Sequence, residues 1–321
     1  MLPVAVDAMG GDKAPEEIVA GATQAATEHG IPVVLVGRPD AIGDTDLEVI
    51  AASEVIEMHD DPAQGVRRKK DSSLVRAAEA VRDGRASAMV SAGNTGATMA
   101  SALLRMGRLP GVARPAIATP IPVPGGTPTV LLDAGANAEC SAEWLVQFAQ
   151  MGAAFARHRF NIEKPRVALL SIGEEDTKGT PLVKETHALL REASGIDFIG
   201  NVEGRDLISD AADVVVTDGF TGNVALKTLE GSMRFMVGAV FGAMVATDEA
   251  KEAAKVLMPA LAPLADELDP DSHGGAMLLG VNGVCIIGHG SSSARAVVNA
   301  VRVARDMVEA DLVGAIAASV R

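Results

Sequence analysis

The stretch "ASAMVSAGNTGATMASALL", residues 86–104, joins a short apolar run to a loop of Gly and small polar residues, and then to a helical apolar pattern. The same unit recurs with the apolar runs "PVAVD" (3–7), "TVLLD" (129–133), "RVALLS" (166–171), "DVVVT" (213–217) and "GVCIIG" (283–288). Strands that alternate with helices predict an α/β fold with a mostly parallel sheet flanked by helices. The runs are continuously apolar, which is typical of buried parallel strands.

Each notable polar loop follows a predicted strand and precedes a helix. In an open α/β sheet such loops lie at the carboxyl ends of the strands, where ligands bind. We therefore expect the polar loops to gather on one edge of the sheet. The Pro-rich stretch "RPAIATPIPVPGGTPT", residues 114–129, is a poor helix and predicts a crossover between two lobes with a cleft between them.

Composition excludes several classes of protein. The chain has 321 residues, 48% of them hydrophobic, which suits one α/β unit of 1–321 with a large core. A net charge of −14 argues against a nucleic-acid partner, which needs a basic face. Cys140 and Cys285 form no CxxC motif, the N-terminus lacks a signal-peptide pattern, and no apolar run reaches the ~18 residues of a spanning helix. We expect a cytoplasmic protein that can still lie on a membrane surface.

Two loops have the composition of an anion site. In "SAGNTGA", Gly93 and Gly96 let backbone N–H groups approach a ligand, and a helix is expected to start near Thr95. In "HGSSSAR", His289 and Ser291 precede a helix whose first turn carries Arg295. Phosphate suits hydroxyls, helix N–H groups and a cation. The alternative for both loops is a turn with a helix cap.

Other loops add polar groups of several kinds. "AMGGDKAPEE" places Asp7, Gly10, Gly11 and Asp12 either in the cleft or in turn capping. "SIGEEDTKGTPLVKE" presents Lys178 beside Gly179, as a partner for a phosphate or oxyanion or as a solvated surface residue. Asn223 and Asn137 can each donate to a carbonyl oxygen or cap a helix.

Motifs of several common enzymes are missing from the sequence. There is no Walker loop, no convincing GxGxxG after the first strand, no GxSxG elbow and no HExxH. Cys140 has no adjacent basic residue, and a metal site at His273 and His289 lacks a typical spacing. We therefore expect neither a cofactor nor a metal, and a substrate anion as the nucleophile.

The motifs "VAVDAMGGDKAPE", "RRKKDSS", "SAGNTGA", "LLDAGAN", "FIGNVEGRD", "VVVTDGFTGNVALKTLEG" and "HGSS" appear in this order from Val4 to Ser292. Together they resemble the bacterial acyl-ACP:phosphate acyltransferases of phospholipid synthesis, the PlsX family. The resemblance implies that inorganic phosphate attacks the thioester of acyl carrier protein, giving acyl phosphate and free carrier protein. It also implies a homodimer with an isocitrate dehydrogenase-like or phosphotransacetylase-like fold, and a downstream glycerol-phosphate acyltransferase as a partner.

By the same resemblance, Lys178 and Asn223 activate phosphate and the thioester carbonyl, and His289 protonates the leaving thiolate. The expected substrate-binding residues come from the loops described above: Asp7, Gly10, Gly11, Asp12, Ser91, Gly93, Asn94, Thr95, Gly96, Asp133, Asn137, Gly179, Asp218 and Ser291.

Two further segments are candidates for contact with partners. The basic run Arg67, Arg68, Lys69 and Lys70 can dock the acidic carrier protein, bind phosphate or form a solvated turn. In residues 247–272, a protruding helical hairpin is expected, because Pro259 and Pro263 should forbid one straight helix. Its membrane-contact, dimer-contact or acyl-groove residues are Leu257, Leu261, Leu264 and Leu268.

Three rival functions remain at this point. A short-chain phosphotransacetylase would use a coenzyme A thioester. A scaffold would bind acyl carrier protein without catalysis. A dehydrogenase of the same fold would need a metal-binding carboxylate cluster and a nucleotide loop, and the sequence shows neither.

Overall fold

The computed structural model describes residues 1–320, residue 270 by its backbone only. Its strands form one sheet in the order β3-β2-β1-β4-β11-β10-β5-β6-β9-β7-β8. The strands span β1 Val4–Asp7, β2 Val33–Gly37, β3 Glu48–Ala51, β4 Ala88–Ser91, β5 Ala116–Ile121, β6 Thr129–Leu132, β7 Arg166–Leu170, β8 Asp197–Val202, β9 Val214–Val216, β10 Ala276–Leu279 and β11 Val284–Ile287. All six strands expected from the apolar runs are present.

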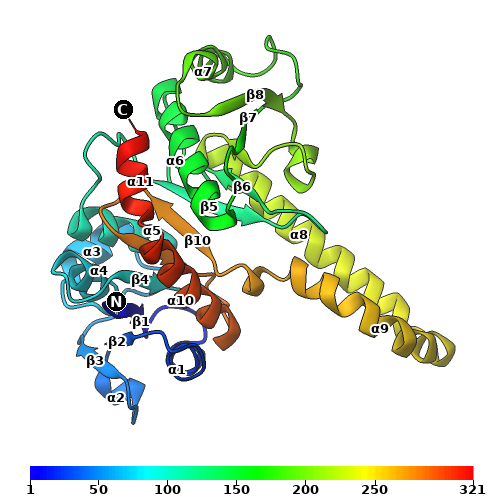
Figure 1. The fold of residues 1–321 in the computed structure, drawn as a ribbon. Coiled ribbons are helices and arrows are strands. Elements are labelled where there is room, and N and C mark those ends of the chain that lie inside the picture. Colours follow the sequence, from blue (N-terminus) through cyan, green and yellow to red (C-terminus); the bar gives the residue numbers. More distant parts are fainter. Residues whose placement is uncertain (321) are drawn as a thin grey trace.

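Helices cover both faces of this sheet (Figure 1). They span α1 Glu16–His29, α2 Pro39–Ile42, α3 Pro62–Arg68, α4 Ser73–Arg82, α5 Thr95–Ser101, α6 Ala142–Phe160, α7 Pro181–Glu192, α8 Gly219–Met244, α9 Asp248–Leu268, α10 Ala294–Glu309 and α11 Leu312–Ser319. A π-helical turn, Ala102–Met106, continues α5, and short 3-10 turns span Gly204–Ile208 and Pro270–Ser272.

Alternate strand residues face opposite helical layers. In β1, Val4 and Val6 join a buried cluster with α1, α6 and α10, whereas Ala5 joins a second cluster with α4 and α5. In β6, Leu132 faces α6, and Leu131 belongs to a third cluster against which α8 packs. The strands are thus buried on both faces, as their unbroken apolar runs predict.

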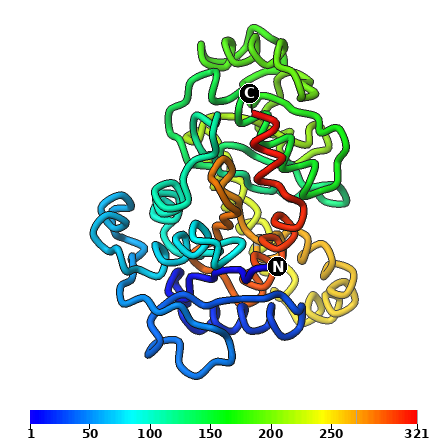
Figure 2. The backbone as a smooth tube through the Cα atoms, turned by 60° about the vertical axis from the view of Figure 1, so that its left-hand side comes forward, coloured from blue at the N-terminus to red at the C-terminus, as the bar shows by residue number. Residues whose placement is uncertain are grey.

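Two parallel blocks of strands correspond to two lobes. The first block is β3-β2-β1-β4-β11 and the second is β6-β9-β7-β8. Figure 2 shows the N-terminal part of the chain, in blue to cyan, and the middle of the chain, in green, as two masses, with the C-terminal segment passing from one to the other. The expected two-lobed α/β architecture is confirmed.

The lobes are joined by antiparallel strands. β10 pairs antiparallel with β11 and with β5, and β5 pairs antiparallel with β6. Three successive reversals make the second block run opposite to the first. The stretch 114–129 forms no helix, contains β5 and leads into β6 of the second block. Pro120 is tolerated there because its recorded ladder partner lies only on the β6 side.

A long helical pair, α8 with α9, projects from the body (Figure 1). The expectation of a hairpin within residues 247–272 needs correction, because that segment is one arm and α8 is the other. Pro259 and Pro263 do not end the helix, since α9 continues through both. Each Pro removes one N–H donor, and the exposed position of this helix leaves the freed carbonyls open to water.

Among residues 1–320, no helix combines the length and apolarity that crossing a membrane requires.

The contact between α8 and the end of β6 generates a prediction about Gly222. A Cβ at this position would lie 2.0 Å from the carbonyl oxygen of Asp133, whereas a Cβ at Gly231 on the same helix meets nothing within 4 Å. Gly222→Ala should lower the free energy of unfolding by about 3 kcal/mol through overpacking. The control Gly231→Ala should raise it by about 0.5–1 kcal/mol through helix propensity. Urea unfolding followed by circular dichroism measures both changes, and equal midpoints would contradict this packing.

Candidate active site

The loops after β1, β4 and β11 form one cluster, which we call the first cluster. Its centre is the buried carboxylate of Asp7, which accepts hydrogen bonds from Ser91 Oγ at 2.7 Å and from the Met9 N–H at 3.2 Å. The Gly93 N–H donates in turn to Ser91 Oγ at 3.1 Å. Burial raises the pKa of Asp7 above its ordinary value. Asp7 and Ser91 therefore organise the loops from within.

Close backbone contacts hold these loops together. A Cβ on Gly10 would lie 2.8 Å from the Gly93 nitrogen, so the first loop requires glycine at this point. The Asp12 N–H donates to the Gly290 carbonyl at 2.7 Å, which joins the first loop to the last. Gly10, Gly11, Asp12 and Gly93 therefore lie together in the first cluster.

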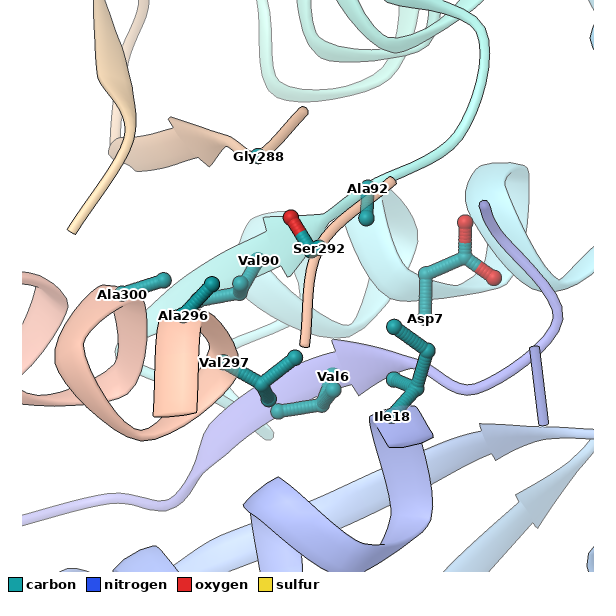
Figure 3. Close-up of a pocket in the computed structure, with 10 residues that line it drawn as sticks. All are labelled: Val6, Asp7, Ile18, Val90, Ala92, Gly288, Ser292, Ala296, Val297 and Ala300. Atoms are coloured by element: carbon teal, nitrogen blue, oxygen red, sulfur yellow. The ribbon is translucent and has the colours of Figure 1, made fainter. Parts of the chain in front are cut away.

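The hollow beneath the first cluster is lined mainly by the core (Figure 3). Asp7 and Ser292 are its polar members, and Val6, Val90 and Val297 are among its apolar ones. A volume of about 10 Å³ holds at most one water molecule. A substrate at this cluster would therefore lie on the outer side of the loops.

The side chains on the outer side of the loops differ in how many hydrogen bonds they make within the protein. Thr95 is exposed, and His289 Nδ1 lies 2.8 Å from Ser291 Oγ, both residues being exposed. Asn94 instead caps α5 through the Ala97 N–H and donates to two carbonyls of residues 58 and 60. Its amide is fully engaged, which favours the capping interpretation over substrate contact.

Gly96 likewise has a packing role. A Cβ there would lie 2.7 Å from Pro62 Cγ, at the contact between α5 and α3.

The loops after β6 and β9 form the second cluster, around the buried carboxylate of Asp133, and the loop after β7 follows the neighbouring parallel strand. Its Oδ1 accepts the N–H groups of Ile117, Gly135 and Ala136 at 3.0, 3.2 and 2.9 Å. Its Oδ2 accepts the N–H and the side-chain amide of Asn137 at 2.7 and 2.9 Å. Burial raises the pKa of Asp133, and these bonds oppose the rise. The amide of Asn137 also donates to the carbonyl of residue 115 at 2.8 Å, so it holds the loop.

Asn223 lies in the first turns of α8, beside the Asp133 loop. The helix is capped by Asp218, whose carboxylate accepts the N–H and the hydroxyl of Thr221 at 2.8 Å each. Asn223 therefore does not cap the helix. It is exposed, it lies against Gly135, and its amide has no hydrogen-bond partner within residues 1–320. The side chain is free to meet a ligand.

Lys178 lies in the loop between β7 and α7. Its side chain is exposed, and its ammonium makes no ion pair or hydrogen bond with the described part of the chain. Gly179 follows with φ +97°, a conformation that favours glycine. Because β7 and β9 are parallel neighbours, Lys178 and Asn223 follow strands that end side by side.

The two clusters lie at opposite edges of the sheet. Each is at the carboxyl ends of its own strands, but the second block of strands runs antiparallel to the first. The expectation that all polar loops gather on one edge is therefore wrong. The strand reversal separates His289 from Lys178 and Asn223 within one copy of the chain. Local sequence patterns do not reveal this separation, since it depends on the pairing of β10 and β5.

The basic run begins at the end of α3. Arg67, Arg68 and Lys70 are exposed. Lys69 differs, because its ammonium donates to Asp60 at 2.5 Å and to the Val55 carbonyl at 2.7 Å. Its hydrogen bond lowers the pKa of Asp60. Because the Lys69 ammonium is bound within the chain, Lys69 is not a candidate docking residue.

The helical pair α8–α9 exposes many apolar side chains. Among the predicted leucines, Leu257 and Leu264 are exposed, whereas Leu261 and Leu268 are partly buried. Phe235, which is 73% exposed, extends the apolar surface along α8.

Neither cysteine has the character of a nucleophile. Burial raises the pKa of Cys140 to about 11 and that of Cys285 to about 12. Within residues 1–320, no group of three or more His, Cys, Asp or Glu side chains could hold a metal ion.

Two residues near Lys178 were missed by the sequence analysis. His187 and Asn201 are buried and contact the Lys178 loop. The sequence signals for Asn201 are its place at the end of the apolar run "DFIGNV" and within the motif "FIGNVEGRD".

Comparison with solved structures supports the fold. A phosphotransacetylase from Streptococcus pyogenes superposes with a TM-score of 0.65 at 17% identity, covering 96% of this chain and 94% of that one. A 4-hydroxythreonine-4-phosphate dehydrogenase from Klebsiella pneumoniae gives a TM-score of 0.53 at 13% identity, with 96% and 100% covered. Both show a shared architecture.

Comparison of sequences shows the family. The family model described as "Fatty acid synthesis protein" matches residues 2–314. A phosphate acyltransferase of Heliobacterium modesticaldum is 50% identical, with 98% of this chain and 96% of the relative covered. A phosphate acyltransferase of Geobacillus thermodenitrificans is 47% identical, with 98% of each covered. The chain, with its free lysine and asparagine at neighbouring strand ends, therefore belongs to the PlsX family of phosphate acyltransferases and is an acyltransferase enzyme.

Proposed function

We propose that this enzyme transfers a fatty acyl group from the thioester of acyl carrier protein to inorganic phosphate. The products are an acyl phosphate and free carrier protein, and the acyl phosphate is consumed in phospholipid synthesis by a glycerol-phosphate acyltransferase. The observation that carries the proposal is the pair Lys178 and Asn223. Both are exposed, both side chains lack partners among the described residues, and both follow parallel neighbouring strands in a chain of the phosphate acyltransferase family.

In the proposed step, a phosphate oxygen attacks the thioester carbonyl carbon, and the carbon–sulfur bond then breaks. Lys178 offsets the charge of phosphate, and the Asn223 amide donates to the carbonyl oxygen as it becomes negative. The proton of hydrogenphosphate balances the thiolate that leaves, so the reaction takes up no proton overall. Orienting the two substrates in this way can supply roughly 7–11 kcal/mol of the barrier.

The proposed mechanism uses no covalent enzyme intermediate. Cys140 is the cysteine nearest to the second cluster, because its thiol lies 3.6 Å from the Asn137 carbonyl. A thiol with a pKa of about 11 is protonated at neutral pH and is a poor nucleophile.

A homodimer would reunite the residues that strand direction separates. We propose that the first cluster of one copy, with His289, meets the second cluster of the other copy, with Lys178. The apolar surface of α8–α9 supports contact with a second copy, and we further propose that this hairpin touches the membrane surface from the cytoplasm. Arg67, Arg68 and Lys70 are the proposed docking residues for acidic carrier protein on a chain of net charge −14.

A short-chain phosphotransacetylase that uses acyl-CoA is the second candidate. The likeness in fold to the phosphotransacetylase of Streptococcus pyogenes favours it. Acetyl-CoA and palmitoyl carrier protein, compared at equal concentration with phosphate, separate the two candidates.

Lys178→Ala should lower kcat/KM for phosphate-dependent formation of palmitoyl phosphate by about 100-fold or more, because a charge that stabilises the transition state is lost. Mass spectrometry of the acyl phosphate measures the rate. Cys140→Ser is the matched control and should retain activity within about twofold, since the protonated thiol takes no part. Full activity of Lys178→Ala, or a palmitoylated Cys140 when phosphate is omitted, would contradict the mechanism.

Mixed dimers test the shared site. Lys178→Ala and His289→Ala should each be impaired alone, and co-refolding them should restore about a quarter of wild-type activity, because half of the dimers then carry one intact site out of two. Activity of the mixture is compared with the mean of the two separate variants. No gain on mixing would mean that each site lies within one copy, and an unimpaired His289→Ala would remove His289 from the site.

A further inference from the structure

A short series of polar contacts with buried residues holds the loop that carries Lys178, residues 171–180. The Lys178 N–H donates to the Glu175 carbonyl at 3.0 Å, which closes a turn. The same carbonyl accepts a hydrogen bond from the side-chain amide of Asn201 at 3.0 Å. Asn201 lies in β8 and is buried. The backbone turn that presents Lys178 is therefore fixed by a residue of a neighbouring strand.

The orientation of Asn201 determines what its other atom can do. Because Nδ2 donates to the Glu175 carbonyl, Oδ1 faces His187, whose Nδ1 lies 2.9 Å away. An amide oxygen only accepts, so His187 Nδ1 carries a proton and donates. His187 is 4% exposed and lies in α7. Its ring meets Phe198 edge to face at 5.1 Å, which restricts the ring orientation.

The second ring nitrogen of His187 faces the Lys178 loop directly. Nε2 lies 3.7 Å from the Asp176 carboxylate and has no hydrogen-bond partner within the described residues. The other oxygen of Asp176 pairs with Arg191 of α7 at 2.5 Å. His187 thus reaches the loop at two adjacent points, the Glu175 carbonyl through Asn201 and the Asp176 carboxylate through Nε2.

We propose that His187 is a positioning residue for Lys178. This inference rests on the proposed function of Lys178, and it adds the residues that hold its loop in place. A buried imidazole that serves only to pack α7 against β8 would not need a donor toward Asn201 or a ring nitrogen aimed at the loop. Nδ1 is paired with Asn201, whereas Nε2 stays buried beside the loop without a hydrogen-bond partner, at a cost of about 1–3 kcal/mol.

Two substitutions at residue 187 separate positioning from packing. His187→Leu keeps an apolar side chain in the core, and removes both the hydrogen bond to Asn201 and the ring nitrogen beside Asp176. His187→Asn places an amide N–H near the position of Nδ1, so it can still donate to Asn201. We expect His187→Leu to lower kcat by about 10- to 100-fold with little change in KM for the acyl donor, because the ammonium is displaced. His187→Asn should recover most of that loss.

His187→Leu made in the Lys178→Ala background shows whether the loss of kcat passes through Lys178. A residue that acts only through Lys178 should cause no further loss there. Hydrogen exchange of residues 171–180 should accelerate in His187→Leu and stay unchanged in His158→Leu, a control that removes an imidazole from the last turn of α6. Should His187→Leu fail to fold, Asn201→Leu cuts the contact to the Glu175 carbonyl and takes its place.

Equal losses of kcat with and without Lys178, or unchanged hydrogen exchange of residues 171–180, would overturn the proposal. So would activity in His187→Asn no higher than in His187→Leu. Failure of the proposed function gives a different result. In that case Lys178→Ala alone retains activity, while hydrogen exchange still reports whether His187 holds the loop.

Discussion

The second lobe depends on one buried carboxylate. Asp133 ends β6 and accepts five N–H bonds, which connect the start of β5, the loop after β6 and the side chain of Asn137. Leaving any such donor unpaired in the core would cost about 1–3 kcal/mol. The first turn of α8 contacts this loop closely at Gly219 and Gly222. Asn223 then emerges at a fixed point beside Gly135.

The first lobe uses the same device, with Asp7 at the end of β1 and Ser91 at the end of β4. Burial raises the pKa of both aspartates, so each loop cluster is built around a desolvated acid. The antiparallel strands β10 and β5 then set the two clusters at opposite strand ends. A single copy thus presents two half-sites, each with an organised backbone and a few free side chains.

The local sequence pattern was sufficient to predict much of the fold and of the candidate site. The six apolar runs before glycine loops are strands, and Lys178 and Asn223 are exposed where a polar loop was expected. Nonlocal contacts account for what the local pattern did not reveal. Pro120 lies in a strand because its ladder partner is on one side only, and the amide of Asn94 is engaged by carbonyls 34 and 36 residues away. The strand reversal follows from the antiparallel pairing of β10 and β5, and no short stretch of sequence shows which strands will pair.

The central claim is that Lys178 and Asn223 act on one reacting centre. Its most direct test is a double-mutant cycle on kcat/KM with Lys178→Ala, Asn223→Ala and the double variant. Residues that act as a unit are strongly non-additive, so the double variant should be no more than about tenfold slower than the slower single variant. A double variant whose loss equals the product of the two single losses would show that the residues act independently and would contradict the account.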